Sequence, residues 1–148
     1  MSILKLEFNL FSLVHSNIAD SNREIMKIQY YPTPEIKEHL RVFHENIIVP
    51  ILLHFKASQG YELRCDSGYR CNLLNNHKDV GGSKTSDHLK GYAGDLKLYY
   101  NGVKINEELF DFCQKNLKFK ELIDERHYKW VHISFVPGDL NQEILHLK

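Results

Sequence analysis

The stretch Ser86-Asp87-His88-Leu89-Lys90-Gly91-Tyr92-Ala93-Gly94-Asp95 decides how the chain is interpreted. It joins a polar, glycine-containing loop over residues 77–90 to a strand that we predict over residues 92–100. Apolar and polar residues alternate along that strand, so Asp95 lies on its polar face. His88 lies at the end of the loop, so the stretch carries two potential metal ligands.

A second strand, predicted over residues 130–135, has the same two faces and places His132 on the polar one. Small residues follow the loop histidine in the first stretch: Gly91, Ala93 and Gly94. We expect them to let the backbone and a bulky ligand shell approach each other closely.

His88, Asp95 and His132 have the residue types of a catalytic zinc site, which takes three protein ligands and leaves one position open. Zinc in such a site lowers the pKa of water to about 7 and polarises a carbonyl, which is hydrolytic chemistry at neutral pH. The spacing also fits a second interpretation, in which a solvated loop histidine and a hydrogen-bonded strand aspartate bind no metal. Neither a His-x-x-x-His helix nor a Cys-x-x-Cys knuckle is present to decide between them.

The remaining patterns predict an α+β fold, an antiparallel sheet flanked by helices, in a single domain over residues 1–148. The longest predicted helix begins at Thr33-Pro34, and Pro50 should kink or split it. The other predicted elements are a strand over 61–65 ending in a turn at 66–68, a short helix over 69–76, a hairpin at 101–102, a helix capped by Asn106, a strand over 121–124, and a polar tail from Pro137.

Composition excludes several classes of protein. The 148 residues hold 19 Lys and Arg against 19 Asp and Glu, so the basic surface that nucleic-acid binding requires is not expected. No apolar run approaches the roughly 18 residues of a membrane-spanning helix. The first residues show no secretory cleavage site, and three cysteines are too few for a disulfide framework, so we expect reduced thiols.

At this point four ordered motifs resemble those of the zinc D-alanyl-D-alanine carboxypeptidase family, which includes phage L-alanyl-D-glutamate endolysins. Residues 86–95 match its S-x-H-x-x-G-x-A-x-D motif. Ser67-Gly68-Tyr69-Arg70 is similar to its S-G-Y-R turn, Val80-Gly81-Gly82-Ser83 to the V-G-G-S of one branch, and Trp130-Val131-His132-Ile133-Ser134 to its W-V-H-I-S strand. The resemblance covers most of the chain.

The resemblance implies a fold shared with the hedgehog signalling domain and a zinc ion bound by His88, Asp95 and His132. It implies that Arg70 holds a substrate carbonyl or carboxylate, a task that suits a planar and permanently charged guanidinium. Ser86 would lie near the ligand loop and hydrogen-bond the substrate. The implied reaction is hydrolysis of a peptide bond next to a D-amino acid in peptidoglycan stem peptides, by a carboxypeptidase or an endopeptidase.

The general base is where the chain departs from the family pattern. Members commonly carry an acid three positions before the last histidine, and Lys129 stands there. In the W-V-H branch an acid follows a Leu-Ile pair on the preceding strand, and Leu122-Ile123-Asp124-Glu125 is similar to that arrangement. We predict that Glu125 is the base, because it matches the L-I-x-E position, with Asp124 and His127 as alternatives.

Lys129 in place of the usual acid also supports a second hypothesis. In it, the chain is a zinc-containing binding or virion structural module that catalyses no reaction. The absence of a signal sequence leads us to expect a protein made in the cytoplasm. Such a protein would act on the cell wall after release or export, as a phage or prophage product would.

Overall fold

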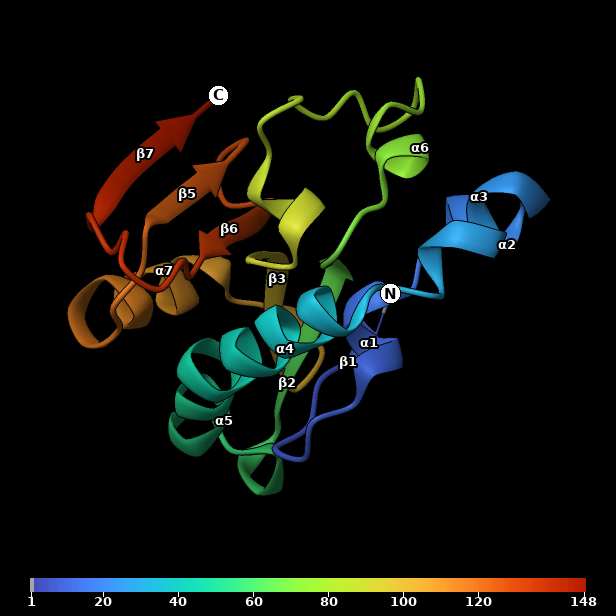
Figure 1. The fold of residues 1–148 in the computed structure, drawn as a ribbon. Coiled ribbons are helices and arrows are strands. Elements are labelled where there is room, and N and C mark those ends of the chain that lie inside the picture. Colours follow the sequence, from blue (N-terminus) through green and yellow to red (C-terminus); the bar gives the residue numbers. More distant parts are fainter. Residues whose placement is uncertain (1) are drawn as a thin grey trace.

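The computed structural model describes residues 2–148, which build a mixed sheet with helices packed against it (Figure 1). Within these residues seven strands form the sheet, in the order β1-β2-β3-β6-β5-β7, and β4 pairs with β3. The strands are β1 (Ser2–Ile3), β2 (Tyr61–Ser67), β3 (Ala93–Tyr100), β4 (Val103–Lys104), β5 (Glu121–Glu125), β6 (Trp130–Ser134) and β7 (Glu143–Leu147).

Short helices follow β1 in the sequence, and longer ones pack against the apolar face of the sheet. The α-helices are α1 (Leu10–Val14), α2 (Asn17–Asp20), α3 (Arg23–Gln29), α4 (Pro34–Phe43), α5 (Val49–His54), α6 (Asn72–Asn75) and α7 (Asn106–Asn116). Three further helical segments are the π-helical turn η1 (His44–Ile48) and the 3-10 turns η2 (Ala57–Gln59) and η3 (Asp87–Lys90). The predicted α+β class, with a sheet flanked by helices, is confirmed.

The longest helical segment begins as the sequence predicts and is then divided near Pro50. Thr33 Oγ1 accepts a hydrogen bond from the amide of Ile36, 3.2 Å away, and Pro34 occupies the first turn. Proline has no amide hydrogen to continue the helical ladder. The chain accommodates it through the π-helical turn η1, which separates α4 from α5 just before Pro50.

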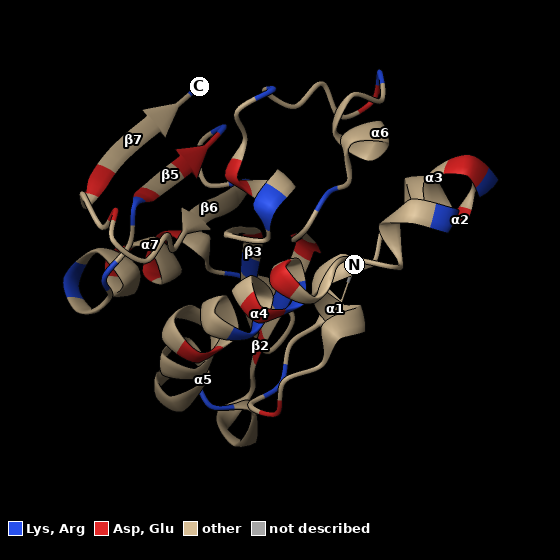
Figure 2. Cartoon of the chain, in the orientation of Figure 1, with Lys and Arg blue, Asp and Glu red and all other residues tan. Residues whose placement is uncertain are grey.

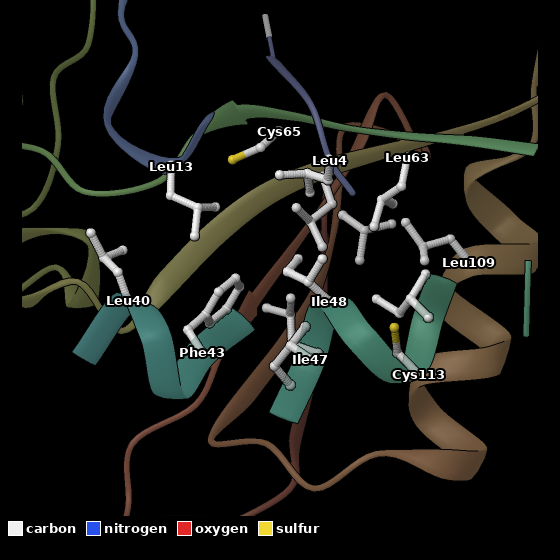
Figure 3. Packing of buried hydrophobic residues seen from close by; sticks show 14 of the residues in the cluster. Leu4, Leu13, Leu40, Phe43, Ile47, Ile48, Leu63, Cys65, Leu109 and Cys113 are labelled. Carbon is white, nitrogen blue, oxygen red and sulfur yellow. The ribbon is translucent and has the colours of Figure 1, made fainter. Parts of the chain in front are cut away.

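The core lies between this segment, α7 and the apolar face of the sheet (Figure 3). Phe43 and Ile47 are fully buried there, together with Leu63 of β2. A Cβ atom built on Gly94 would lie 3.0 Å from the Phe43 ring. The expectation that Gly94 makes room for a ligand shell is therefore wrong, because this glycine makes room for a helix instead.

The expectation of a wholly antiparallel sheet is wrong at one edge. The five other strand pairs are antiparallel, but β7 pairs parallel with β5, with Leu122 opposite Ile144. After β6 the chain passes the start of β5, where the Gln142 amide donates to Phe119 O at 3.0 Å, and then runs alongside β5. The predicted polar tail from Pro137 thus contains an edge strand that covers β5.

Three predicted boundaries also shift. Strand β2 continues to Ser67 through an irregularity after Cys65, so the predicted turn at 66–68 begins later. Helix α6 is shorter than predicted and begins at Asn72. Asn106 does not cap α7, because its buried side chain bonds the amide of Leu98 and two carbonyl groups of the β5–β6 turn.

Charged residues of both signs are interspersed over helices and strands (Figure 2). Among residues 2–148, the helices are all too short or too polar to cross a lipid bilayer.

Gln29, at the end of α3, joins three segments of backbone and is completely buried. Its Nε2 donates to Val14 O at 2.7 Å and to Tyr69 O at 2.8 Å, and its Oε1 accepts from the Cys71 amide at 2.8 Å. Two of these partners flank Arg70, so the side chain of Gln29 fixes the backbone on both sides of that residue.

Replacing Gln29 by leucine should lower the free energy of unfolding by about 3 kcal/mol, because buried donors and acceptors would lose their partners at about 1–3 kcal/mol each. Urea unfolding followed by circular dichroism measures the change. The matched control is Gln114→Leu on the exposed side of α7, which should change stability by less than about 0.5 kcal/mol. Equal effects of the two substitutions would refute the bridging role.

Candidate metal centre

His88, Asp95 and His132 meet on the face of the sheet opposite the helices. Asp95 and His132 are direct partners in the pairing of β3 with β6, and η3 brings His88 beside them. One ligand atom from each residue lies within 4.8 Å of the other two. Asp95 Oδ1 is 3.2 Å from His88 Nε2 and 3.0 Å from His132 Nδ1.

The orientation of His88 leaves one ring nitrogen free inside the protein. Its Nδ1 lies 2.7 Å from Gly68 O, and since a carbonyl oxygen only accepts, Nδ1 carries the hydrogen. Nε2 is then the unprotonated nitrogen, is buried, and has no hydrogen-bond partner among residues 2–148. A neutral histidine that donates through one nitrogen and offers the other is the arrangement found in metal sites.

Electrostatics favour a neutral His88, an ionised Asp95 and a protonated His132, so binding a cation would require His132 to lose its proton. Burial lowers the pKa of His88, which favours the neutral ring. Burial would raise the pKa of Asp95, but the neighbouring His88 and the hydrogen bond from His132 outweigh it and hold that pKa well below its usual range. Burial opposes the charged form of His132, but its hydrogen bond to Asp95 prevails and raises the pKa of His132.

The donor set fits zinc. Two imidazoles and one carboxylate are the ligand types of catalytic zinc sites. The unpartnered Nε2 of His88 supplies an independent observation, because a buried polar atom without a partner costs free energy unless something binds it. These three residues could therefore hold a divalent metal ion.

Arg70 points into the same cluster and is fixed by three neighbours. Its Nε donates to Ser67 Oγ at 2.8 Å, Nη1 to Asn75 Oδ1 at 3.1 Å, and Nη2 to Asp95 Oδ2 at 3.2 Å. Only 13% of the side chain is exposed. A guanidinium has five N–H groups, so one on each terminal nitrogen stays available to another acceptor.

Asn75 is the residue of this site that the sequence analysis missed. It is buried, it accepts from Arg70, and its Nδ2 donates to Ser83 O at 2.9 Å, which ties the arginine to the loop over residues 77–86. A Cβ atom on Gly82 would lie 2.0 Å from Asn75 Oδ1, so this glycine allows the loop to approach. Nothing in the spacing of the short helix distinguishes this asparagine from its neighbours.

The loop that carries His88 is held at both sides. Ser86 Oγ accepts from the His88 amide at 3.2 Å and so caps η3, as loop serines commonly do. The carboxylate of Asp87 pairs with Lys120 Nζ at 3.0 Å, across from the start of β5. Ser86 nonetheless lines the hollow described next, where its hydroxyl can also meet a ligand.

A polar hollow of about 620 Å³ opens above the cluster. The loop over residues 77–86, which arches from α6 to η3 in Figure 1, forms one wall, and β5 with β6 forms the other. The side chains around it that bear on chemistry are Arg70, Ser86, His88, Asp95, Glu125 and His132.

The geometry around β5 distinguishes the three candidates for the general base, Glu125, Asp124 and His127. Glu125 lines the hollow, and burial, followed by the charge of Asp95, raises its pKa. Asp124 points to the other side of the strand, where its oxygens bond the Tyr128 amide at 2.6 Å and His146 Nδ1 at 3.1 Å. His127 is exposed in the β5–β6 turn and does not line the hollow.

Lys129, which stands where family members commonly carry an acid, is also exposed in that turn and does not line the hollow. Its amide donates to Glu125 O at 3.0 Å, which closes the turn. Of the acids considered for the base, Glu125 alone therefore has access to the hollow.

A family model described as peptidase M15 matches residues 35–134, which run from α4 to the end of β6. The match includes the whole cluster, Arg70 and Glu125. Searches of curated proteins and of solved structures give no match, so the likeness to the hedgehog fold stays a prediction. Because the family model covers more than half of the chain and contains the clustered ligand set, the chain belongs to the peptidase M15 family of zinc-dependent peptidases.

Proposed function

We propose that the chain hydrolyses peptide bonds next to D-amino acids in peptidoglycan stem peptides, with a zinc ion held by His88, Asp95 and His132. The observation that carries the proposal is the buried, unpartnered Nε2 of His88, which faces Asp95 in a cluster completed by His132. Membership in the peptidase M15 family supports the peptidase activity. The four motifs, above all the W-V-H-I-S strand, support the choice of peptidoglycan as substrate.

Zinc, when bound, would acidify water and polarise the carbonyl of the scissile bond. The reaction breaks the C–N bond of the peptide and forms a C–O bond from water. Glu125 takes the proton that water loses and delivers it to the leaving amine, for which a raised pKa makes it a better base.

Arg70 and Ser86 position the substrate in this proposal. The two unused N–H groups of Arg70 donate to the carbonyl oxygen as its negative charge develops, and they cost no reorganisation because Ser67, Asn75 and Asp95 already hold the guanidinium. Ser86 donates its hydroxyl hydrogen to the peptide at the edge of the hollow. The same protein would be made in the cytoplasm and reach the cell wall after release or export.

Digestion of purified muropeptides, with and without a chelator, tests the function. We expect mass spectrometry to detect cleavage beside a D-amino acid, its loss after chelation, and its recovery on adding zinc. The fragment masses distinguish removal of a terminal D-alanine from a cut within the stem. Zinc bound in stoichiometric amount without any cleavage would instead favour the non-catalytic module.

A further inference from the structure

A second hollow, of about 520 Å³, continues the first. The two hollows share three lining residues, Arg70, Val80 and Trp130. They therefore meet at the indole of Trp130 and the guanidinium of Arg70. A peptide that lies across the metal cluster can therefore extend past Trp130 into this second hollow. The far wall there comes from the start of α2, with Asn17 and Ile18.

Among the charged groups of the second hollow, Arg126 stands out as the cation without an anionic partner in residues 2–148. Asp66 pairs with Lys97 at 2.7 Å, and Arg70 pairs with Asp95. His15 bonds Asp20, and Asp79 lies 3.8 Å from His77 with most of its side chain exposed. The guanidinium of Arg126 lies 5.6 Å from the centre of the Trp130 ring.

The backbone that carries Arg126 is held in an unusual conformation. Arg126, His127 and Tyr128 have φ angles of 52°, 58° and 61°, the left-handed region that costs free energy for residues with a side chain. Two hydrogen bonds maintain the turn, from the Tyr128 amide to Asp124 Oδ1 and from the Arg126 amide to Leu147 O, both at 2.6 Å. The backbone of Arg126 is thereby fixed directly after Glu125, and its exposed side chain lies beside the indole of Trp130.

We infer that Arg126 binds a carboxylate of the substrate that lies outside the scissile bond, in a subsite formed by the second hollow. The inference rests on the proposed peptidase function and adds a specificity-determining residue to it, one that favours peptides with a free carboxylate near the bond that is cleaved. A guanidinium recognises a carboxylate through parallel N–H groups, and the indole of Trp130 restricts its orientation. The free α-carboxylate of a γ-linked D-glutamate is a group of this chemistry.

The test compares two stem pentapeptides that differ only in this group, one with γ-D-glutamate and one with its α-carboxamide. Trp130 is the only tryptophan of the chain, so its fluorescence reports binding without requiring turnover. We expect the zinc-loaded protein to bind the carboxylate peptide about five- to tenfold more tightly, a preference that weakens at high salt. The kcat/KM values should show the same preference.

Arg126→Gln should remove the preference while leaving the affinity for the carboxamide peptide unchanged, and Arg126→Lys should retain part of it. The matched control is Arg23→Gln, which alters an exposed arginine that does not line the hollow. The inference is wrong if the wild type shows no preference or if Arg126→Gln keeps it. If the preference depends on Arg126 but no peptide is cleaved, the subsite stands and the proposed catalytic function fails.

Discussion

His132→Ala is expected to remove the bound zinc and to lower kcat/KM by about a thousandfold or more. The substitution takes one ligand atom from a set of three and removes the hydrogen bond between His132 and Asp95 Oδ1. A catalytic metal ion contributes several kcal/mol of transition-state stabilisation, and each 1.36 kcal/mol corresponds to a factor of ten in rate. Metal analysis gives the zinc content of the variant, and muropeptide cleavage by the same preparation gives its kcat/KM.

The control for this variant is His54→Ala, which alters an exposed histidine at the end of α5, away from the hollow. It should keep its zinc and its activity. Circular dichroism of both variants separates loss of the ligand from loss of the fold. Full zinc content and full activity in the folded His132→Ala protein would exclude the proposed centre.

Glu125→Gln should lower kcat by a factor of about one hundred to ten thousand while the protein keeps its zinc, because general-base catalysis contributes about that much. Glutamine is nearly isosteric with glutamate. Within residues 2–148, Glu125 makes no hydrogen bond to the metal ligands, so its replacement should leave the metal content unchanged. A structural defect would instead lower the metal content. Substrate affinity, followed by Trp130 fluorescence, should change far less than kcat.

Two further variants decide between the candidates for the base. Asp124→Asn should lower stability, since Asp124 holds the β5–β6 turn, and should retain measurable cleavage. His127→Asn should retain cleavage too, and asparagine tolerates the left-handed backbone at this position. If Asp124→Asn abolished turnover while Glu125→Gln preserved it, the assignment of the base would be reversed.

Local patterns predict the parts of the fold that depend on neighbouring residues. The alternation that places Asp95 and His132 on polar faces survives in β3 and β6, and the Asn101-Gly102 pair does lead into β4. The parallel strand β7 escapes prediction, because none of its five residues is buried and its partner β5 is not the strand that precedes it in the sequence.

The residues of the candidate site likewise fall into a group that local patterns predict and a group that they do not. Its charged and metal-binding residues belong to short motifs with recognisable spacing. Gln29 and Asn75, which hold Arg70 in place, belong to none. Their partners are backbone atoms and a guanidinium brought together by folding, and a polar residue in a short helix has no local signal of such contacts.

The hydrogen bonds of Gln29 have a consequence for any attempt to isolate a smaller working unit. The segment recognised by the family model starts at residue 35, yet the support for the arginine turn comes from α3, upstream of that start. A fragment trimmed to the boundaries of the family match would keep every reactive group and lose the hydrogen bonds that help to orient one of them. We therefore expect a fragment that begins at residue 35 to hold Arg70 less firmly than the full chain does.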